Sequence, residues 1–279
     1  TILRLAELVL TLNSFQFGDS HYQQTSGVAM GTRMGPSYAC LFVGYVESQI
    51  FQQYSGPMPA LFRRFIDDCV GLWTGDKNKL LSFINFVNAF HPCLKFTHGI
   101  SDSSLPFLDI KLKISPDNQT ISTSVHYKNT DSHSYLLYSS SHPSATKRAI
   151  PFSQFLRLRR LCSNDEDFHI QAAQMTTFFQ TRGYPVELIQ QALNQAKDIS
   201  REEALIPKTK ANHKDRALVA LTYHPHNLEV KKILSKNFPI LQTDPKVGKT
   251  FQKPPLVAFK RDRNLGDLLT RSSFHSMAP

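Results

Sequence analysis

Two adjacent acidic residues, Asp67 and Asp68, lie between two apolar segments that favour β-strands. The first segment runs from Leu61 to Ile66 and the second from Cys69 to Trp73. This pattern predicts a β-hairpin that carries both carboxylates at its tip. Because neighbouring like charges repel, such a pair is typical either of a solvated turn or of a site where both carboxylates bind divalent cations.

A loop of small residues precedes this hairpin, from Gln24 to Gly35. Small residues let the backbone approach a base pair or a sugar closely. Pro36 then suits the first turn of a helix, whose N-terminus favours phosphate oxygens. The loop is therefore a candidate for contacts to a nucleotide or a template strand. The alternative is a flexible loop that caps the helix.

The remaining sequence alternates between helical and strand-like patterns, which predicts an α+β fold. Helices are expected over residues 2–12, 36–53, 76–90, 152–162, 165–182, 185–199 and 227–236, and strands over 15–17, 94–100, 105–114, 120–127 and 216–223. Asp76 is the expected cap of one helix, Gly183 the expected stop of another, and Pro185 the expected start of the next. Residues 201–215 indicate a polar linker, and the proline-containing end is expected to be loosely structured.

The formal net charge of +10 is concentrated toward the C-terminus. Residues 1–126 contain nine Lys or Arg and nine Asp or Glu, whereas residues 201–279 contain 15 and seven. A basic second half is expected of a protein that holds a polyanion, and a solvated basic tail is the alternative. The apolar stretches are too short to predict a membrane span. The four cysteines show neither a zinc-site nor a disulfide spacing.

Five basic residues lie in the first part of the helical half. They are Lys147, Arg148, Arg157, Arg159 and Arg160. Arg157 and Arg160 share one helix face, opposite an apolar face. Three helices with a Gly-containing turn also resemble a helix-turn-helix unit. We expect this region to bind nucleic acid in a salt-sensitive and weakly sequence-specific way.

The order of a small-residue loop, a helix and an Asp–Asp hairpin is that of the parts of a polymerase palm. Here the chain resembles the reverse transcriptases of Penelope-like retroelements over nearly its whole length. Motifs that carry the resemblance are Phe15-x-Phe17, Gly27-x-Ala29-Met30-Gly31, Arg64-Phe65-Ile66-Asp67-Asp68, Phe107-Leu108-Asp109-Ile110, Ser141-His142-Pro143 and Arg182-Gly183-Tyr184-Pro185.

The resemblance implies an RNA-directed DNA polymerase that acts on an RNA template and a DNA primer. It implies a partial palm with an antiparallel sheet over residues 1–126, an α-helical thumb over 127–200 and a basic connector over 201–279. Asp67 and Asp68 would be the catalytic residues and would bind Mg²⁺ or Mn²⁺ in a two-metal site. Nucleotide or template contacts would come from Gln24, Gly27, Ala29, Met30, Gly31 and Phe65. No membrane and no protein partner are indicated, and the nucleus is the expected location.

Some parts of the family pattern are expected outside these 279 residues. A further metal-binding Asp would precede Thr1, and a GIY-YIG endonuclease module would follow Pro279. Asp109 is the internal candidate for a third carboxylate, although hydrogen bonding at a strand end is the preferred interpretation. We therefore expect a polymerase fragment that is inactive alone. The alternative is a non-catalytic, helix-turn-helix-like nucleic-acid-binding protein derived from a retroelement.

Overall fold

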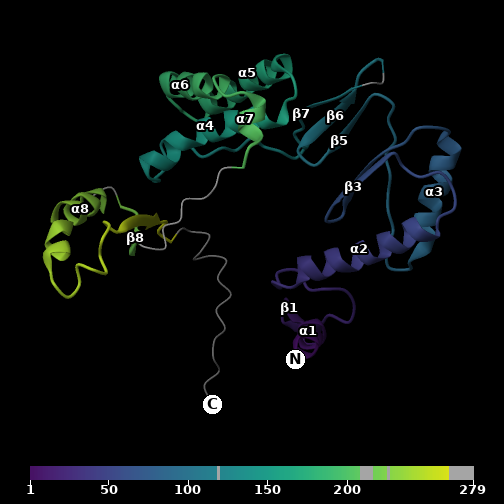
Figure 1. Cartoon of the computed structure of the whole chain (residues 1–279), viewed down its shortest axis with the longest axis horizontal. Coiled ribbons are helices and arrows are strands. Elements are labelled where there is room, and N and C mark those ends of the chain that lie inside the picture. Colours follow the sequence, from purple (N-terminus) through teal and green to yellow (C-terminus); the bar gives the residue numbers. More distant parts are fainter. Residues whose placement is uncertain (118–119, 208–215, 225–226, 264–279) are drawn as a thin grey trace. The chain divides into compact units, whose positions relative to one another are not determined.

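The computed structural model describes residues 1–117, 120–207, 216–224 and 227–263 (Figure 1). The chain divides into two compact units, Thr1–Gln119 and Thr120–Pro279. Each unit contains helices and strands, so the expected α+β class is confirmed. Within the described ranges, no helix is long and apolar enough to cross a membrane.

The first unit is built from helices and antiparallel hairpins. Its elements are α1 (Ile2–Thr11), β1 (Ser14–Phe17), β2 (Ser20–Gln23), α2 (Gly35–Gln53), β3 (Leu61–Phe65), β4 (Asp68–Leu72), α3 (Lys77–Phe90), β5 (Ser104–Phe107) and β6 (Ile110–Ile114). Strands β1 and β2, β3 and β4, and β5 and β6 pair antiparallel. Asp76 caps α3 as expected, because its side chain accepts a hydrogen bond from the backbone N–H of Asn78.

The core of the first unit is an aromatic cluster between α2 and α3. Val46 and Ile50 of α2 and Phe83 of α3 are buried. Phe51 of α2 meets Phe62 of β3 edge to face, with ring centroids 5.3 Å apart. Edge-to-face contacts of this kind add to the free energy gained from burial. The β3–β4 hairpin is thereby held against α2.

Two strand predictions in the first unit are wrong. Residues 105–114 form β5 and β6 rather than one strand, because the chain reverses at Leu108, which has φ 53°. Residues 94–100 are not a strand. Instead, the Asn88 side chain accepts a hydrogen bond from the Phe96 N–H (2.6 Å) and donates one to the Phe96 carbonyl (3.0 Å). These bonds satisfy backbone groups that a neighbouring strand would otherwise bind.

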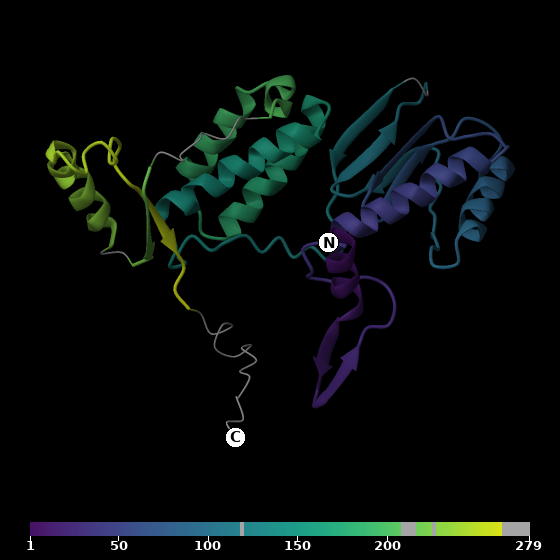
Figure 2. The ribbon, with the colours of Figure 1, turned by 60° about the horizontal axis from the view of Figure 1, so that its bottom comes forward.

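The second unit contains a group of helices and a β–α–β segment. Its elements are β7 (Ile121–Val125), α4 (Ser144–Leu161), α5 (Asp165–Thr181), α6 (Val186–Lys197), α7 (Arg201–Leu205), β8 (Leu218–Thr222), α8 (Leu228–Thr243) and β9 (Leu256–Lys260). Helices α4, α5 and α6 pack side by side (Figures 1 and 2). Their largest fully buried side chains are Phe155, Leu158, Phe168, Met175, Phe179 and Ile189. The helical half that the sequence predicts therefore has its own core.

Helices α4 and α7 correct two predictions. Helix α4 begins at Ser144 instead of residue 152 and contains Pro151. Proline costs an interior hydrogen bond, but Pro151 is fully buried, and its packing offsets that cost. Residues 201–205, expected to be part of a linker, form α7. The Ser200 side chain accepts a hydrogen bond from the Glu203 N–H, which caps this short helix.

Residues 228–260 contain more regular structure than expected. Strand β9 pairs parallel with β8, and Leu218 lies opposite Leu256. Helix α8 forms the connection and extends to Thr243, seven residues beyond the predicted end. A parallel pair needs such a crossover. Parts of the predicted basic connector, residues 208–215 and 264–279, lie outside the described residues.

Candidate functional site

The hairpin of β3 and β4 carries the two acidic residues at its turn. Phe65 lies opposite Asp68, so Ile66 and Asp67 form a two-residue loop. Ile66 has φ 57°, a conformation that β-branched residues rarely adopt. Both carboxylates belong to exposed residues. The predicted hairpin is confirmed, and it presents two adjacent acids to solvent on a strained loop.

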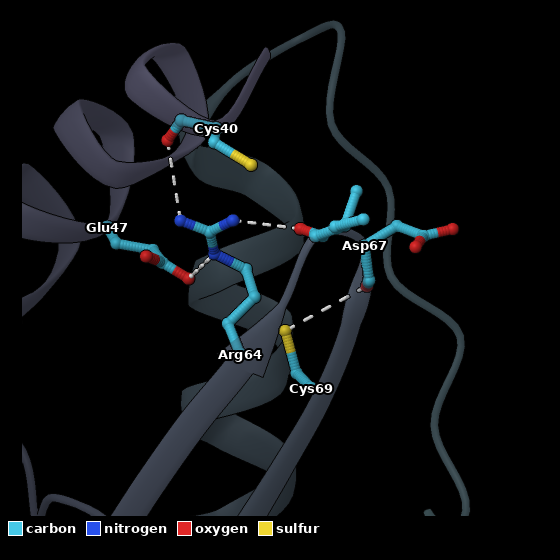
Figure 3. Close-up of polar contacts among 6 residues, drawn as sticks. Cys40, Glu47, Arg64, Asp67 and Cys69 are labelled. Atoms are coloured by element: carbon cyan, nitrogen blue, oxygen red, sulfur yellow. Dashed lines mark hydrogen bonds and ion pairs between the residues drawn. The ribbon is translucent and has the colours of Figure 1, made fainter. Parts of the chain in front are cut away.

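Arg64 fastens this turn to helix α2 (Figure 3). Its Nε donates to Oε1 of Glu47 at 2.6 Å, and its Nη1 donates to the Ile66 carbonyl at 2.8 Å. A longer bond, 3.5 Å, runs from Nη2 to the Cys40 carbonyl. The side chains of Arg64 and Glu47 are only 14% and 21% exposed. The hydrogen bond to Glu47 raises the pKa of Arg64, so the guanidinium remains charged.

Cys69 provides a second contact to the turn. It lies opposite Arg64 in the hairpin register, and its Sγ lies 4.0 Å from the Asp67 carbonyl oxygen (Figure 3). Burial, with a smaller contribution from the charge of Glu47, raises the pKa of Cys69 to about 11. The group is therefore a thiol at neutral pH and acts as a weak donor to this carbonyl.

Asp67 and Asp68 have the chemistry of ligands for a hard divalent cation. The Asp67 carboxylate points away from the Arg64 guanidinium (Figure 3). In the described part of the chain, neither carboxylate accepts a hydrogen bond or forms an ion pair. Carboxylate oxygens suit Mg²⁺ and Mn²⁺. No group of three or more His, Cys, Asp or Glu among the described residues is arranged to hold a metal, so the turn offers two ligands.

The small-residue loop before α2 contains hydrogen bonds of its own. The Gln24 side chain donates to the Ser26 carbonyl at 2.8 Å. Gly27 and Gly31 have φ 79° and 96°, which favours glycine at both positions. Among the described contacts, no hydrogen bond joins this loop to the Asp–Asp turn. The structure therefore places the two predicted parts of a nucleotide site on separate elements.

The other three predicted nucleotide contacts differ in exposure. Ala29 is half-buried, and its carbonyl accepts hydrogen bonds from the backbone and side chain of Thr32. Met30 is fully exposed. Phe65 is 55% exposed and lies opposite Asp68, so the two side chains share one face of the hairpin. Of these residues, Phe65 is the one that the register places beside the acids.

Helices α5 and α6 are joined by a tight turn. The Tyr184 N–H donates to the Phe179 carbonyl at 3.1 Å, and the Gly183 N–H donates to the Gln180 carbonyl at 3.0 Å. Gly183 has φ 76°, which completes a Schellman motif. Tyr184 is buried, with its ring 5.1 Å from that of Phe179. The predicted stop at Gly183 and the start of α6 after Pro185 are confirmed.

Arg159 makes contacts within the protein. Its Nε donates to the Ile199 carbonyl at 2.9 Å, and its guanidinium lies 5.0 Å from the centre of the Phe168 ring. It also forms an ion pair with Asp165, and this hydrogen bond lowers the pKa of the Asp165 carboxyl. The Arg159 side chain is 15% exposed. Its first role is therefore to hold α4, α5 and the chain after α6 together.

Arg160 and Lys147 are also bonded to backbone carbonyls. Arg160 Nε donates to Ala204 of α7 at 2.8 Å. Lys147 Nζ donates to Tyr138 at 2.8 Å and to Ser140 at 3.0 Å, and it lies 5.2 Å from the Tyr138 ring centre. Both cations thus stabilise segments that pack beside α4.

The last two predicted basic residues differ from each other. Arg157 is half-buried and lowers the pKa of Tyr127, against the larger raising effect of burial. Arg148 is exposed, and the hydrogen bond from its guanidinium to the Ser144 hydroxyl is long, at 3.4 Å. Arg148, and the outer nitrogens of the exposed Arg160, are therefore the predicted guanidinium groups that a phosphate can reach.

The sequence interpretation overlooked the exposed side of α6. Ile189, Ala192 and Ala196 of this helix are buried. The opposite side presents four amide side chains to solvent: Gln190, Gln191, Asn194 and Gln195. The pairs Gln190–Asn194 and Gln191–Gln195 are four residues apart and Gln191–Asn194 three apart, a spacing that places such side chains together on a helix surface. These four residues are neutral, so a search for charged side chains does not find them.

Comparison with known families supports the helix-turn-helix interpretation of this region. A family model described as an animal helix-turn-helix domain matches residues 134–194, and no reverse-transcriptase family was detected. The matched range contains α4, α5 and most of α6. No curated protein and no solved structure matches the chain.

Proposed function

We propose that this chain binds nucleic acid through the helix-turn-helix formed by α5 and α6, supported by α4. The observation that carries the proposal is the family match over residues 134–194, which includes the Schellman turn at Gly183. In helix-turn-helix proteins the second helix enters a groove while neighbouring helices contact the backbone. This chain offers exposed cations beside that unit, Arg148 on α4 and Lys197 at the end of α6.

The salt dependence of binding tests this proposal. Fluorescence anisotropy of a labelled duplex with the 279-residue chain should show affinity that falls with NaCl concentration, with a log–log slope of about −0.9 per neutralised phosphate. The double variant Arg148→Gln/Lys197→Gln should bind more weakly, and its slope should be shallower by about 0.9 for each phosphate that is no longer neutralised. Arg159 and Arg160 are unsuitable for this test, because their hydrogen bonds stabilise the fold.

A charge-matched control separates a local effect from that of net charge. Lys77→Gln/Lys79→Gln removes two exposed positive charges from α3, in the first unit. This variant should bind with an unchanged salt slope. Binding that is insensitive to salt, or an equal weakening in both double variants, would contradict the proposal.

We propose a second function, in which this chain is a fragment of an RNA-directed DNA polymerase of the Penelope-like kind that is inactive alone, because its hairpin carries two adjacent carboxylates at the turn. The supporting observation is the anchoring of the turn, since Arg64 holds the Ile66 carbonyl from α2. Asp67 and Asp68 would hold Mg²⁺ or Mn²⁺. A bound metal pair would activate a primer 3′-hydroxyl and stabilise the leaving pyrophosphate. Phe65 would flank the incoming nucleotide, and the helices of the second unit would act as a thumb on template and primer.

Metal binding at the turn tests the second function. In Fe²⁺-dependent hydroxyl-radical cleavage, we expect cuts at Ile66 to Asp68 that Mg²⁺ suppresses and that the variant Asp67→Asn/Asp68→Asn lacks. Because the described turn supplies two carboxylates, primer extension by the chain alone should not exceed that of Asp67→Ala/Asp68→Ala. Cleavage elsewhere, or equal cleavage in the Asn variant, would count against metal binding here.

A further inference from the structure

The exposed side of α6 carries two rows of side chains along the helix. One row is Val186, Gln190 and Asn194, and the other is Glu187, Gln191 and Gln195, each spaced by four residues. All six residues are exposed, and the buried side of the helix faces the core. Between residues 186 and 196 the sequence contains neither Lys nor Arg. The surface is therefore rich in amides and free of the cations that usually contact phosphates.

These side chains match the edges of bases. Asn and Gln form paired hydrogen bonds with N6 and N7 of adenine, Glu accepts from N4 of cytosine, and apolar groups contact the thymine methyl. Gln190 Nε2 donates to Asn194 Oδ1 at 2.8 Å, so two amides are already aligned along the helix. Val186 is 60% exposed, which leaves an apolar group at the start of the same row.

We propose that α6 reads base edges in the major groove of a DNA duplex and that Gln190, Gln191 and Asn194 select adenine. The inference rests on the proposed nucleic-acid binding and adds its target, a B-form duplex with A·T pairs at the contacted positions. A helix about 10–12 Å across fits a major groove about 12 Å wide. The major groove of an RNA duplex is too deep and narrow for it. Arg182 and Lys197 lie before and at the end of α6, where phosphates would flank the bases.

The test is selection by the 279-residue chain from a duplex library with a random segment of roughly 20 base pairs, about two turns of B-form DNA. Selection should enrich a motif that contains A·T pairs. The enriched duplex should bind about tenfold or more tightly than a scrambled one of the same length. In Gln190→Ala/Gln191→Ala/Asn194→Ala this ratio should fall toward one, with the affinity for the scrambled duplex unchanged. Alanine favours helix more than these residues do, so the variant should keep α6 folded.

A matched variant, Gln52→Ala/Gln53→Ala, removes two exposed amides from α2, outside the helix-turn-helix, and should keep the preference. Salt-sensitive binding without an enriched motif, or a motif that the triple variant still prefers, would overturn the inference and leave the proposed function standing. Absence of binding to any duplex at low salt would overturn both. A preference that disappears equally in the α2 variant would also overturn the assignment to α6.

Discussion

Replacing Phe179 with Ala should lower the free energy of unfolding of the helical region by about 3–5 kcal/mol. Phe179 is fully buried on α5. Its ring lies 5.1 Å from those of Tyr135 and Tyr184 and 6.0 Å from that of Phe155. Truncation removes these contacts and leaves a cavity that three rings from different segments cannot fill together. Urea titration followed by far-UV circular dichroism measures the change.

A second site on α5 serves as the control for this prediction. Ile170 is 57% exposed on the same helix, so Ile170→Ala should change stability by no more than about 0.5 kcal/mol. Equal destabilisation of the two variants would show that helix propensity rather than core packing determines stability. A small effect for Phe179→Ala alone would mean that the core described for α4, α5 and α6 is wrong.

Replacing Arg64 with Met should destabilise the first unit by about 1.5–3 kcal/mol, because Glu47 would lose a charged hydrogen bond while remaining mostly buried. The chain has one tryptophan, Trp73, which follows β4 and whose ring centroid lies 6.1 Å from that of Phe83 in the core. Its fluorescence during urea unfolding therefore reports on this unit. Removal of the Arg64 guanidinium also frees the Ile66 carbonyl, so the cleavage by Fe²⁺ at the turn should weaken.

Two further variants define the origin of that destabilisation. In a double-mutant cycle that combines Arg64→Met with Glu47→Gln, the double variant should be more stable than the sum of the two single changes predicts. This follows because the two side chains interact directly. Arg63 is the neighbouring arginine on the opposite, exposed face of the hairpin, and Arg63→Met should have an effect within about 0.5 kcal/mol. Additive effects, or an equal destabilisation by Arg63→Met, would contradict the anchoring role of Arg64.

Features set by neighbouring residues were predictable from the sequence. Asp76 and Gly183 act within one helical turn, and the acidic hairpin follows from its apolar arms. The capping pattern at Ser200 and Glu203 was also readable, although the composition suggested a linker. By contrast, the chain reverses at Leu108 although that position has neither a glycine nor an asparagine, the residues that usually indicate such a turn. Pairing of β5 with β6 imposes a positive φ at Leu108 that leucine rarely adopts.

The arginines on α4 show a second limit of prediction from sequence, which concerns the binding partners of side chains. A cluster of arginines predicts bonds to oxygen atoms, yet it does not tell whether those belong to phosphates or to the protein. Arg159 and Arg160 bind carbonyls 40 and 44 residues further along the chain. Such partners become visible only in three dimensions. The amides of α6 were overlooked for the complementary reason, because a neutral side chain adds nothing to a count of charge.

The parallel pairing of β8 with β9 has a consequence for how the protein is made. Leu218 is synthesised 38 residues before its partner Leu256. At about 5–20 residues per second, the ribosome would need about two to eight seconds to produce that partner. Through this interval the nascent β8 lacks the ladder partner that pairs with it in the finished protein. The β8–β9 pair can therefore form only after translation has passed residue 256, when the residues of α4, α5 and α6 have already been synthesised.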